Sequence, residues 1–544
     1  MVSVLDEVHS EAEICFQHGM AELAANDIDS ALRWLERAID HDPEYSSAYA
    51  ALGDIYQRTN DPVEADYCLR MALRCSPDSS EILHKLARNC VTLGNRSEAL
   101  ALLREAKDRH SGSVDFLSQL ALIYDDLDET DLAICTWEEV IALNPLDASA
   151  HNNLGLQWHY GKGDVDKALD CFRRALQLNP CLTEARFNLY QAKADAGKVD
   201  EALAGFESML AEPFREEVMF HRSIMLLKNR RFGEGWREYH LRWRYRGTQA
   251  RSFPFPNWDG QPCTGKTLLV YGEQGLGDEI MFASCLRDLH EKTGAKIVLE
   301  CNTRLESLFR RSFPGITVIG RSSAQTSADG LANGATIDFQ TAIGDLPGMF
   351  RAEEAAFPNH RGYLVADPKR VTFWKDRLAA LGEGPKIGIS WRGGQGKTRR
   401  EARSIPLQEW HPILAAEGRH FVSLQYTDCR QELQALEEQH GIVIHHWQEA
   451  IDDYDETAAL VMALDKVITV CTSIVHLTGA LGRPAWVLVP RVPEWRYLAS
   501  GETMPWYPSV RLFRQPRAGD WAPVLRDIAW KLGTVARRVD HDLG

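Results

Sequence analysis

The sequence predicts an α + α/β protein, with an array of helical repeats in its first half and two regions of alternating strands and helices in its second. Three observations support this fold class. Similar residues recur at nearly constant spacing between 12 and 214, whereas short apolar runs alternate with helical spacing after Trp258. The length of 544 residues also exceeds one compact core, so two or three domains are expected.

The composition is that of a folded protein, with 44% hydrophobic and 25% charged residues. The formal net charge of -16 argues against a general nucleic-acid-binding role, which needs basic surfaces that neutralise phosphates. We see no signal sequence at the start and no run of about 18 apolar residues, so we expect a cytoplasmic protein without membrane insertion. Twelve cysteines occur without C-x-x-C pairs or matched histidine spacing, which predicts neither a metal site nor a disulfide framework.

The repeats of the first half are marked by proline and by small residues. Prolines close successive units at Pro43, Pro77, Pro145 and Pro180. A small residue recurs in the first helix of each unit at Gly19, Gly53, Ala87, Ala121 and Gly155. Alanines follow twelve or thirteen positions later at Ala31, Ala65, Ala99, Ala133 and Ala168. A period of about 34 residues with small residues at the helix crossings is typical of the tetratricopeptide repeat, whose arrays bind peptides or proteins.

The domain boundaries follow from these changes of pattern. We expect about six repeats over 1–214, the last of them around Ala202 and Phe206, and a helical cap and linker over 215–257. The two α/β regions are expected over 258–365 and 366–544. Alternating strands and helices imply parallel sheets, with ligands bound at the carboxyl ends of the strands.

The strands of the two α/β regions are short apolar runs. In the first region we expect them at 267–273, 296–302, 316–320 and near 338–350. In the second region they are expected at KIGIS, FVSLQYTD, IVIHHW, KVITVCT and AWVLVP, with a last helix from about Trp521 to Arg538.

Two glycine turns near 260–280 could each contact a phosphate. Gly260 to Thr267 fits the phosphate-loop pattern, but it leads into a strand, whereas such a loop must follow a strand and open a helix. Lys266 is therefore expected to be an ordinary residue at a strand start. The turn at 274–278 does follow a strand and open a helix. Asp278 in this turn is either a helix N-cap or a carboxylate held at the cleft as a general base.

Three blocks, GKTLLVYGEQGLGDEIMFAS, KIGISWRGG with RSIPLQEW, and DETAALVMALDKVITVCTSIVHLTGALGRPAWVLVP, resemble bacterial tetratricopeptide-repeat glycosyltransferases. The catalytic half looks like the lipopolysaccharide heptosyltransferases and, more distantly, the O-linked N-acetylglucosamine transferases. The resemblance covers nearly the whole chain. It implies an N-terminal tetratricopeptide α-solenoid followed by a GT-B fold of two Rossmann-like domains, with the acceptor on the first and the nucleotide sugar on the second.

The resemblance also implies roles for particular residues. Asp278 would be the catalytic base of one inverting displacement, and Arg403 would neutralise the leaving phosphate. Thr472 and Ser473 would hold the phosphate where a strand ends and a helix begins, and His476 would contact the donor. The residues alone favour a solvated surface arginine at Arg403 and a satisfied helix histidine at His476. Cys471 stands where the family has aspartate, which is a departure from the pattern.

Further donor-site residues are expected at strand ends and helix starts. They are Gln274, Gly275, Gly277, Ser390, Trp391, Arg392, Gln425, Trp447, Asp455 and Thr457. Each also has a structural alternative, as a strand-end residue, a core tryptophan or a helix cap. No metal is expected, because GT-B enzymes of this kind work without one.

The expected function is therefore protein O-glycosylation by a metal-independent, inverting enzyme without a cofactor. The repeats would hold a protein acceptor, and flagellin is the nearest role that the resemblance suggests. The donor would be a CMP-linked nonulosonic acid such as CMP-pseudaminic acid, or UDP-N-acetylglucosamine. Two alternatives stay open: transfer to a lipid or polysaccharide acceptor, and a repeat scaffold whose transferase half is inactive.

Overall fold

The protein is described by a computed structural model that covers residues 2–110, 112–211, 215–244, 251, 253–321, 336–393 and 400–539. Its chain divides into two compact units. The first comprises 1–157 with 177–180, and the second comprises 158–176 with 181–544. The predicted boundary at 214/215 adjoins residues 212–214, which lie outside the described residues, so it stays a prediction.

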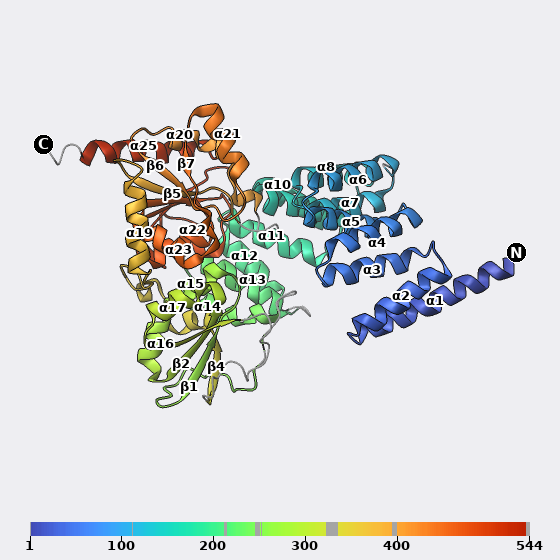
Figure 1. Ribbon diagram of the computed structural model, residues 1–544, viewed down its shortest axis with the longest axis horizontal. Coiled ribbons are helices and arrows are strands. Elements are labelled where there is room, and N and C mark those ends of the chain that lie inside the picture. The colour runs from blue at the N-terminus through green and yellow to red at the C-terminus, as the bar shows by residue number, and fades with distance from the viewer. Residues whose placement is uncertain are drawn as a thin grey trace. The chain divides into compact units, whose positions relative to one another are not determined.

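The first unit consists of antiparallel helix pairs (Figure 1). Its helices are α1 (Val2–Ala24), α2 (Ile28–His41), α3 (Ser46–Arg58), α4 (Pro62–Cys75), α5 (Ser80–Thr92), α6 (Arg96–Arg109), α7 (Val114–Asp126), α8 (Thr130–Leu143) and α9 (Ala148–Leu156). The predicted small residues lie where the helices of a pair cross. A Cβ added at Gly19 would come within 2.9 Å of Leu35 Cγ, and one at Gly53 within 2.7 Å of Leu69 Cγ. Only glycine therefore allows these helices to approach so closely.

The second unit begins with further helices. They are η1 (Gln157–Lys162, a π-helix that starts at the last residue of the first unit's long segment), α10 (Val165–Leu178, whose last two residues belong to the first unit), α11 (Thr183–Asp195), α12 (Val199–Ser208), α13 (Arg215–Lys228), α14 (Phe232–Tyr239) and η2 (His240–Arg244). The π-helix η1 falls in the repeat with the thirteen-residue spacing between Gly155 and Ala168. A π-turn absorbs one extra residue within a helix, which explains how the longer repeat keeps its pattern.

A four-stranded parallel sheet follows, in the order β3-β2-β1-β4. Its strands are β1 (Thr267–Tyr271), β2 (Lys296–Asn302), β3 (Thr317–Arg321) and β4 (Phe339–Ala342). The helices of this region are α15 (Leu276–Ala283), α16 (Leu286–Thr293), η3 (Thr303–Leu305), α17 (Glu306–Ser312), η5 (Ile343–Asp345), α18 (Leu346–Phe350) and η6 (Glu354–Ala356). Lys266 lies directly before β1, and its Nζ lies 3.0 Å from Asp338 Oδ1. The interpretation of Gly260 to Thr267 as a strand lead-in is thus confirmed.

The second sheet has seven strands in the order β10-β11-β9-β8-β5-β6-β7. They are β5 (Lys386–Ser390), β6 (His420–Ser423), β7 (Ile444–His445), β8 (Lys466–Val470), β9 (Ala485–Val489), β10 (Thr503–Met504) and β11 (Tyr507–Arg514). All neighbours are parallel except β10 and β11. Apart from β10, the order is that of a doubly wound sheet, which binds ligands at its switch point, here between β5 and β8.

Helices cover both faces of this sheet (Figure 1). They are α19 (Pro368–Ala379), η8 (Glu401–Arg403), η9 (Leu407–Trp410), α20 (His411–Leu414), α21 (Arg430–His440), α22 (Gln448–Asp452), α23 (Tyr454–Ala463), α24 (Ser473–Ala480), η10 (Trp495–Tyr497) and α25 (Ala522–Val539). Strands β10 and β11 are additions to the predicted set. The run YPSVRLFR carries Pro508 and Arg511, which weaken its strand pattern in the sequence.

Candidate functional site

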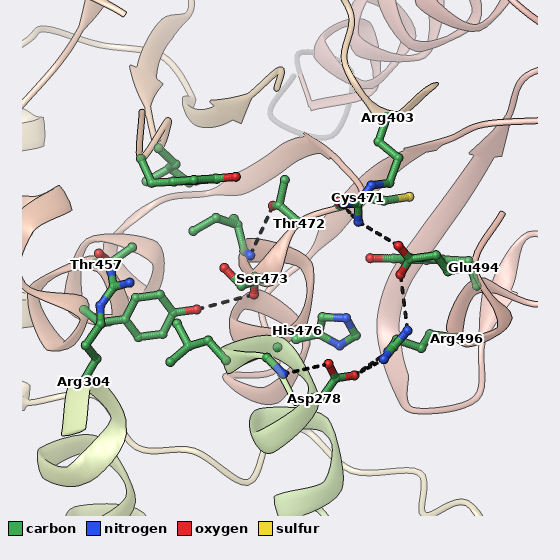
Figure 2. Close-up of a pocket in the computed structure, with 18 of the residues that line it drawn as sticks. Asp278, Arg304, Arg403, Thr457, Cys471, Thr472, Ser473, His476, Glu494 and Arg496 are labelled. Atoms are coloured by element: carbon green, nitrogen blue, oxygen red, sulfur yellow. Dashed lines mark hydrogen bonds and ion pairs between the residues drawn. The ribbon is translucent and has the colours of Figure 1, made fainter. Parts of the chain in front are cut away.

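A cavity of about 400 Å³ lies where the carboxyl end of β1 and that of β8 come together within the second unit. This size suits a small ligand. The residues predicted for the site that line it are Gly275, Gly277, Asp278, Arg403, Thr457, Thr472, Ser473 and His476. The structure thus brings together residues that the sequence separates by about 200 positions, and Figure 2 shows most of them from one side.

Asp278 belongs to the turn that opens α15. The turn starts at Gln274 with φ +61°, and Gly275 is the N-cap of the helix. Asp278 is the third residue of α15, and its Oδ2 accepts the Gly275 N–H at 3.2 Å. The alternative in which Asp278 is itself the N-cap is therefore wrong. Its carboxylate closes the turn and at the same time faces the cavity.

A chain of four charged side chains crosses one side of the cavity (Figure 2). Arg496, in η10, donates from Nε and Nη2 to Asp278 Oδ1. Its Nη1 lies 3.3 Å from Glu494 Oε2, while Arg403 Nη1 lies 2.9 Å from Glu494 Oε1. Burial acts to lower the pKa of Arg496, but the charges of Asp278 and Glu494 outweigh it and raise that pKa. Arg496 therefore stays charged, as an arginine flanked by two carboxylates should.

The charges that line the cavity do not cancel. Among the described residues that line it, Arg304, Arg403 and Arg496 are positive and Asp278 and Glu494 are negative, which leaves one positive charge in excess. Arg304 lies at the other side of the cavity from the charged chain, with its guanidinium carbon 5.2 Å from the centre of the Tyr454 ring (Figure 2). The excess positive charge favours an anionic ligand.

Thr472 and Ser473 form the start of α24. Thr472 is the N-cap, and its Oγ1 accepts the Ile474 N–H at 3.2 Å. The Val475 N–H also donates to the Thr472 carbonyl oxygen, so the Ser473 N–H is the first donor of the helix that can contact a ligand, at the positive end of the helix dipole. The start of α24 is therefore suited to an anion in the cavity. Gly277 allows α15 to approach this point, because a Cβ added there would lie 2.8 Å from His476 Cδ2.

His476 is buried behind this contact, and its Nδ1 lies 3.1 Å from the Tyr507 hydroxyl. Burial, and then the charge of Arg496, lower its pKa to about 3, while Glu494 acts to raise it. A neutral imidazole at neutral pH can position a ligand through a hydrogen bond but carries no charge to offer a phosphate.

This burial predicts a pH dependence of stability. A folded-state pKa of about 3, below the ordinary 6.5, means that neutral His476 stabilises the fold above pH 6.5 and that this stability is lost as the pH falls from 6.5 toward 3. The loss amounts to at most about 1.4 kcal/mol per pH unit. We expect His476→Gln to lose less unfolding free energy than the wild type between pH 7 and pH 5, measured by urea denaturation. His240→Gln, at an exposed site, is the control; equal slopes in all three proteins would contradict the assignment.

Cys471 is a buried thiol at the end of β8. Its Sγ lies 3.6 Å from the Leu488 carbonyl oxygen, and burial raises its pKa to about 12. Its own carbonyl oxygen accepts from Arg403 Nη1 at 3.4 Å. The residue thus contacts Arg403 through its backbone, and the thiol remains neutral.

The other predicted donor residues lie outside the cavity lining. Gln425 is buried, and its Oε1 accepts the N–H groups of Trp391 and Arg392 at 3.2 and 3.0 Å. Ser390 Oγ also contacts Gln425 Oε1, at 3.3 Å. These four residues fix the ends of β5 and β6.

Trp447, Asp455 and Gln274 have structural contacts of their own. Trp447 packs on Trp374 with ring centres 5.3 Å apart, and Asp455 forms an ion pair with Arg311. Gln274 donates to the Tyr239 hydroxyl at 2.9 Å. Thr457 lines the cavity, but its hydroxyl donates to the Ala450 carbonyl of the preceding helix.

The sequence analysis missed several residues that line the cavity. They are Arg304, Tyr426, Tyr454, Glu494, Arg496 and Tyr497. Glu494 and Arg496 follow β9, and Tyr426 follows β6, so the rule that ligands bind at the carboxyl ends of parallel strands could have identified them. Within the described residues, no cluster of three or more His, Cys, Asp or Glu side chains is arranged to hold a metal ion. No helix in the same part of the chain is both long and apolar enough to cross a bilayer.

Comparisons with known proteins identify the first half. The tetratricopeptide repeat family matches residues 22–90 and 118–180, which confirms the predicted repeats. A tetratricopeptide repeat protein from Parabacteroides merdae ATCC 43184 is 18% identical, with a TM-score of 0.34 over 42% of this chain and 91% of that chain.

Two named proteins are also similar to this chain in sequence. Protein FlbA of Caulobacter vibrioides is 32% identical over 520 residues, which are 92% of this chain and 86% of that protein. The human Protein O-mannosyl-transferase TMTC1 is 26% identical over 189 residues, or 33% of this chain and 21% of that protein.

Proposed function

The chain belongs to the same family as Protein FlbA of Caulobacter vibrioides, and from this premise we propose that it is a glycosyltransferase that acts on proteins. It would transfer a sugar from a nucleotide sugar to a Ser or Thr hydroxyl of an acceptor held by the repeats. The name of a second relative, a protein O-mannosyl-transferase, is consistent with this class of reaction. Arrays of this kind offer extended surfaces of the size of a protein segment, which supports a protein as acceptor.

One observation carries the proposal: the Asp278 carboxylate and the guanidinium groups of Arg403 and Arg496 face the same cavity, which lies at the carboxyl ends of β1 and β8 in two different sheets. Sugar transfer needs a base near the attacking hydroxyl and positive charge near the leaving phosphate. Asp278 is the base and Arg403 the cation in this proposal. The start of α24 at Thr472 and Ser473 would supply N–H donors to the same phosphate.

The reaction would be a single displacement. The acceptor oxygen attacks the anomeric carbon, its proton passes to the Asp278 carboxylate, and the bond between that carbon and the phosphate oxygen breaks. Asp278 Oδ1 already accepts two N–H groups of Arg496, and Oδ2 accepts one from Gly275. Since a carboxylate oxygen can accept about two hydrogen bonds, Oδ2 is the atom that would take the proton. Attack from the face opposite the phosphate inverts the anomeric centre.

The two α/β regions would form a GT-B fold, with the acceptor on the β1 side and the donor on the β8 side. The doubly wound strand orders support this arrangement. CMP-linked nonulosonic acids and UDP-N-acetylglucosamine are the proposed donors, and flagellin is the proposed acceptor. The excess positive charge of the cavity suits either donor.

The test is transfer to a defined protein. The full chain is incubated with flagellin and either CMP-pseudaminic acid or UDP-N-acetylglucosamine, and the intact mass of flagellin is measured. We expect an increase equal to one or more sugar residues. If the mass of a lipid or polysaccharide acceptor increases instead, the acceptor is not a protein. If calorimetry shows no binding of a nucleotide sugar, the protein is a repeat scaffold without transferase activity.

A further inference from the structure

Glu494 bridges two arginines at the edge of the cavity. One carboxylate oxygen lies 2.9 Å from Arg403 Nη1 and the other 3.3 Å from Arg496 Nη1. Arg403 comes from η8, whereas Glu494 and Arg496 lie two residues apart after β9, so the fold brings Arg403 to this pair (Figure 2). The carboxylate thus lies between two guanidinium groups, in the position that a bound anion would take.

Burial explains why an anion is needed at this point. The side chains of Arg403 and Arg496 are 10% and 15% exposed, whereas that of Glu494 is 26% exposed. Two guanidinium groups that lie this close in a poorly solvated place repel each other unless negative charge separates them. Glu494 supplies this charge in the free protein, and it is the most exposed member of the three.

A phosphate group would satisfy the same two arginines. Arginine forks bind phosphate oxygens as readily as carboxylate oxygens, and phosphate carries more charge. The start of α24 borders the same cavity, where the Ile474 and Val475 N–H groups donate to Thr472 and the N–H of Ser473 can donate to a further oxygen of the anion. The lining also keeps one positive charge in excess with Glu494 present.

We infer that Glu494 occupies the subsite of the donor's leaving phosphate in the free protein, and that Arg403 and Arg496 are both ligands of that phosphate. The inference rests on the proposed function for the identity of the anion. On binding, the phosphate displaces the Glu494 carboxylate from between the two guanidinium groups, and the carboxylate turns away from them. No covalent bond changes in this exchange.

The opposite role for Glu494 would be to hold the two arginines in place for the phosphate. The two roles predict opposite effects of removing its charge. If Glu494 competes with the phosphate, Glu494→Gln binds phosphate compounds more tightly; if it positions the arginines, the variant binds them less tightly.

The experiment measures the dissociation constants of inorganic pyrophosphate, CMP and UDP for the full chain by isothermal titration calorimetry. We expect Glu494→Gln to lower the dissociation constant of pyrophosphate and of at least one nucleotide about tenfold. Glu238→Gln is the matched control, because Glu238 pairs with Arg222 at similar exposure (13% and 19%) outside the cavity. We expect it to bind all three compounds as the wild type does.

A second variant covers the case in which Glu494→Gln does not fold. Glu494→Asp keeps the charge but is one methylene shorter, so it cannot reach both arginines, and we expect a smaller gain of about threefold. If the folded Glu494 variants bind pyrophosphate, CMP and UDP as the wild type does or less tightly, the inference is wrong. It is also wrong if none of the three compounds binds to these variants.

Failure of the inference and failure of the proposed function give different results. If sugar transfer is observed but the Glu494 variants bind no more tightly, the inference is wrong and the function stands. If the Glu494 variants bind pyrophosphate more tightly but no sugar is transferred, the anion subsite stands and the function is wrong.

Discussion

Asp278→Asn is expected to lower kcat for sugar transfer by about 100- to 10,000-fold, the usual contribution of a general base. The amide has the size of the carboxylate, but its single oxygen can accept from Arg496 or from the Gly275 N–H and not from both, so the variant keeps one of these two contacts. It cannot take the proton of the acceptor hydroxyl. The dissociation constant of the donor should therefore change little, and calorimetry with the nucleotide sugar checks this.

The matched control is Asp338→Asn. Asp338 also pairs with a cation, Lys266, but it lies outside the cavity lining. We expect its kcat to equal that of the wild type. An Asp278→Asn enzyme that keeps more than a tenth of the wild-type kcat would show that the base is another group.

Arg403→Met is expected to lower kcat/KM by about 100- to 1,000-fold, the range found when one group that stabilises a developing negative charge is removed. Methionine fills much of the space of the arginine stem, but it loses the hydrogen bond to the Cys471 carbonyl and the ion pair with Glu494. Negative charge on the leaving phosphate then lacks one of its two arginines. The measurement is the initial rate of transfer at several donor concentrations.

Lys266→Met is the control for this change. Lys266 belongs to the segment that fits the phosphate-loop pattern, yet it precedes β1 and pairs with Asp338. Its loss should leave kcat/KM unchanged. If Lys266→Met and Arg403→Met had the reverse effects, the phosphate would have to lie at the amino end of β1.

The repeats were predictable because the two helices of every unit pack in the same way and therefore need the same residue types at the same positions. A small residue at each helix crossing and an alanine a fixed distance later recur five times, and Ala31, Ala65 and Ala99 are all fully buried. The parallel pairing of the strands was also predictable, from the alternation of strands and helices, whereas the order of the strands in each sheet was not predicted. Strands β10 and β11 were not predicted, because β10 has two residues and because Pro508 and two arginines interrupt the apolar pattern of β11.

The candidate site was only partly predictable. The motif residues Asp278, Arg403 and Thr472 line the cavity, but Ser390 and Gln425 hold the ends of their strands together. A residue at the end of a strand lies near the ligand-binding edge of the sheet, but this position does not determine to which face of the sheet its side chain points. Arg496 was missed because its partner Asp278 is 218 residues away in the chain, and such a pairing leaves no local pattern.

The two helices that meet at the cavity, α15 and α24, differ in one respect. Both present their amino ends to it, but α15 carries Asp278 in its first turn, whereas the first turn of α24 has no acidic residue. The Asp278 carboxylate thus neutralises the positive end of the α15 dipole, whereas the positive end of the α24 dipole has no such carboxylate and can interact with a bound anion. This asymmetry gives the cavity a polarity: under the proposed function, a donor can lie in it only with its phosphate toward Ser473 and its sugar toward Asp278.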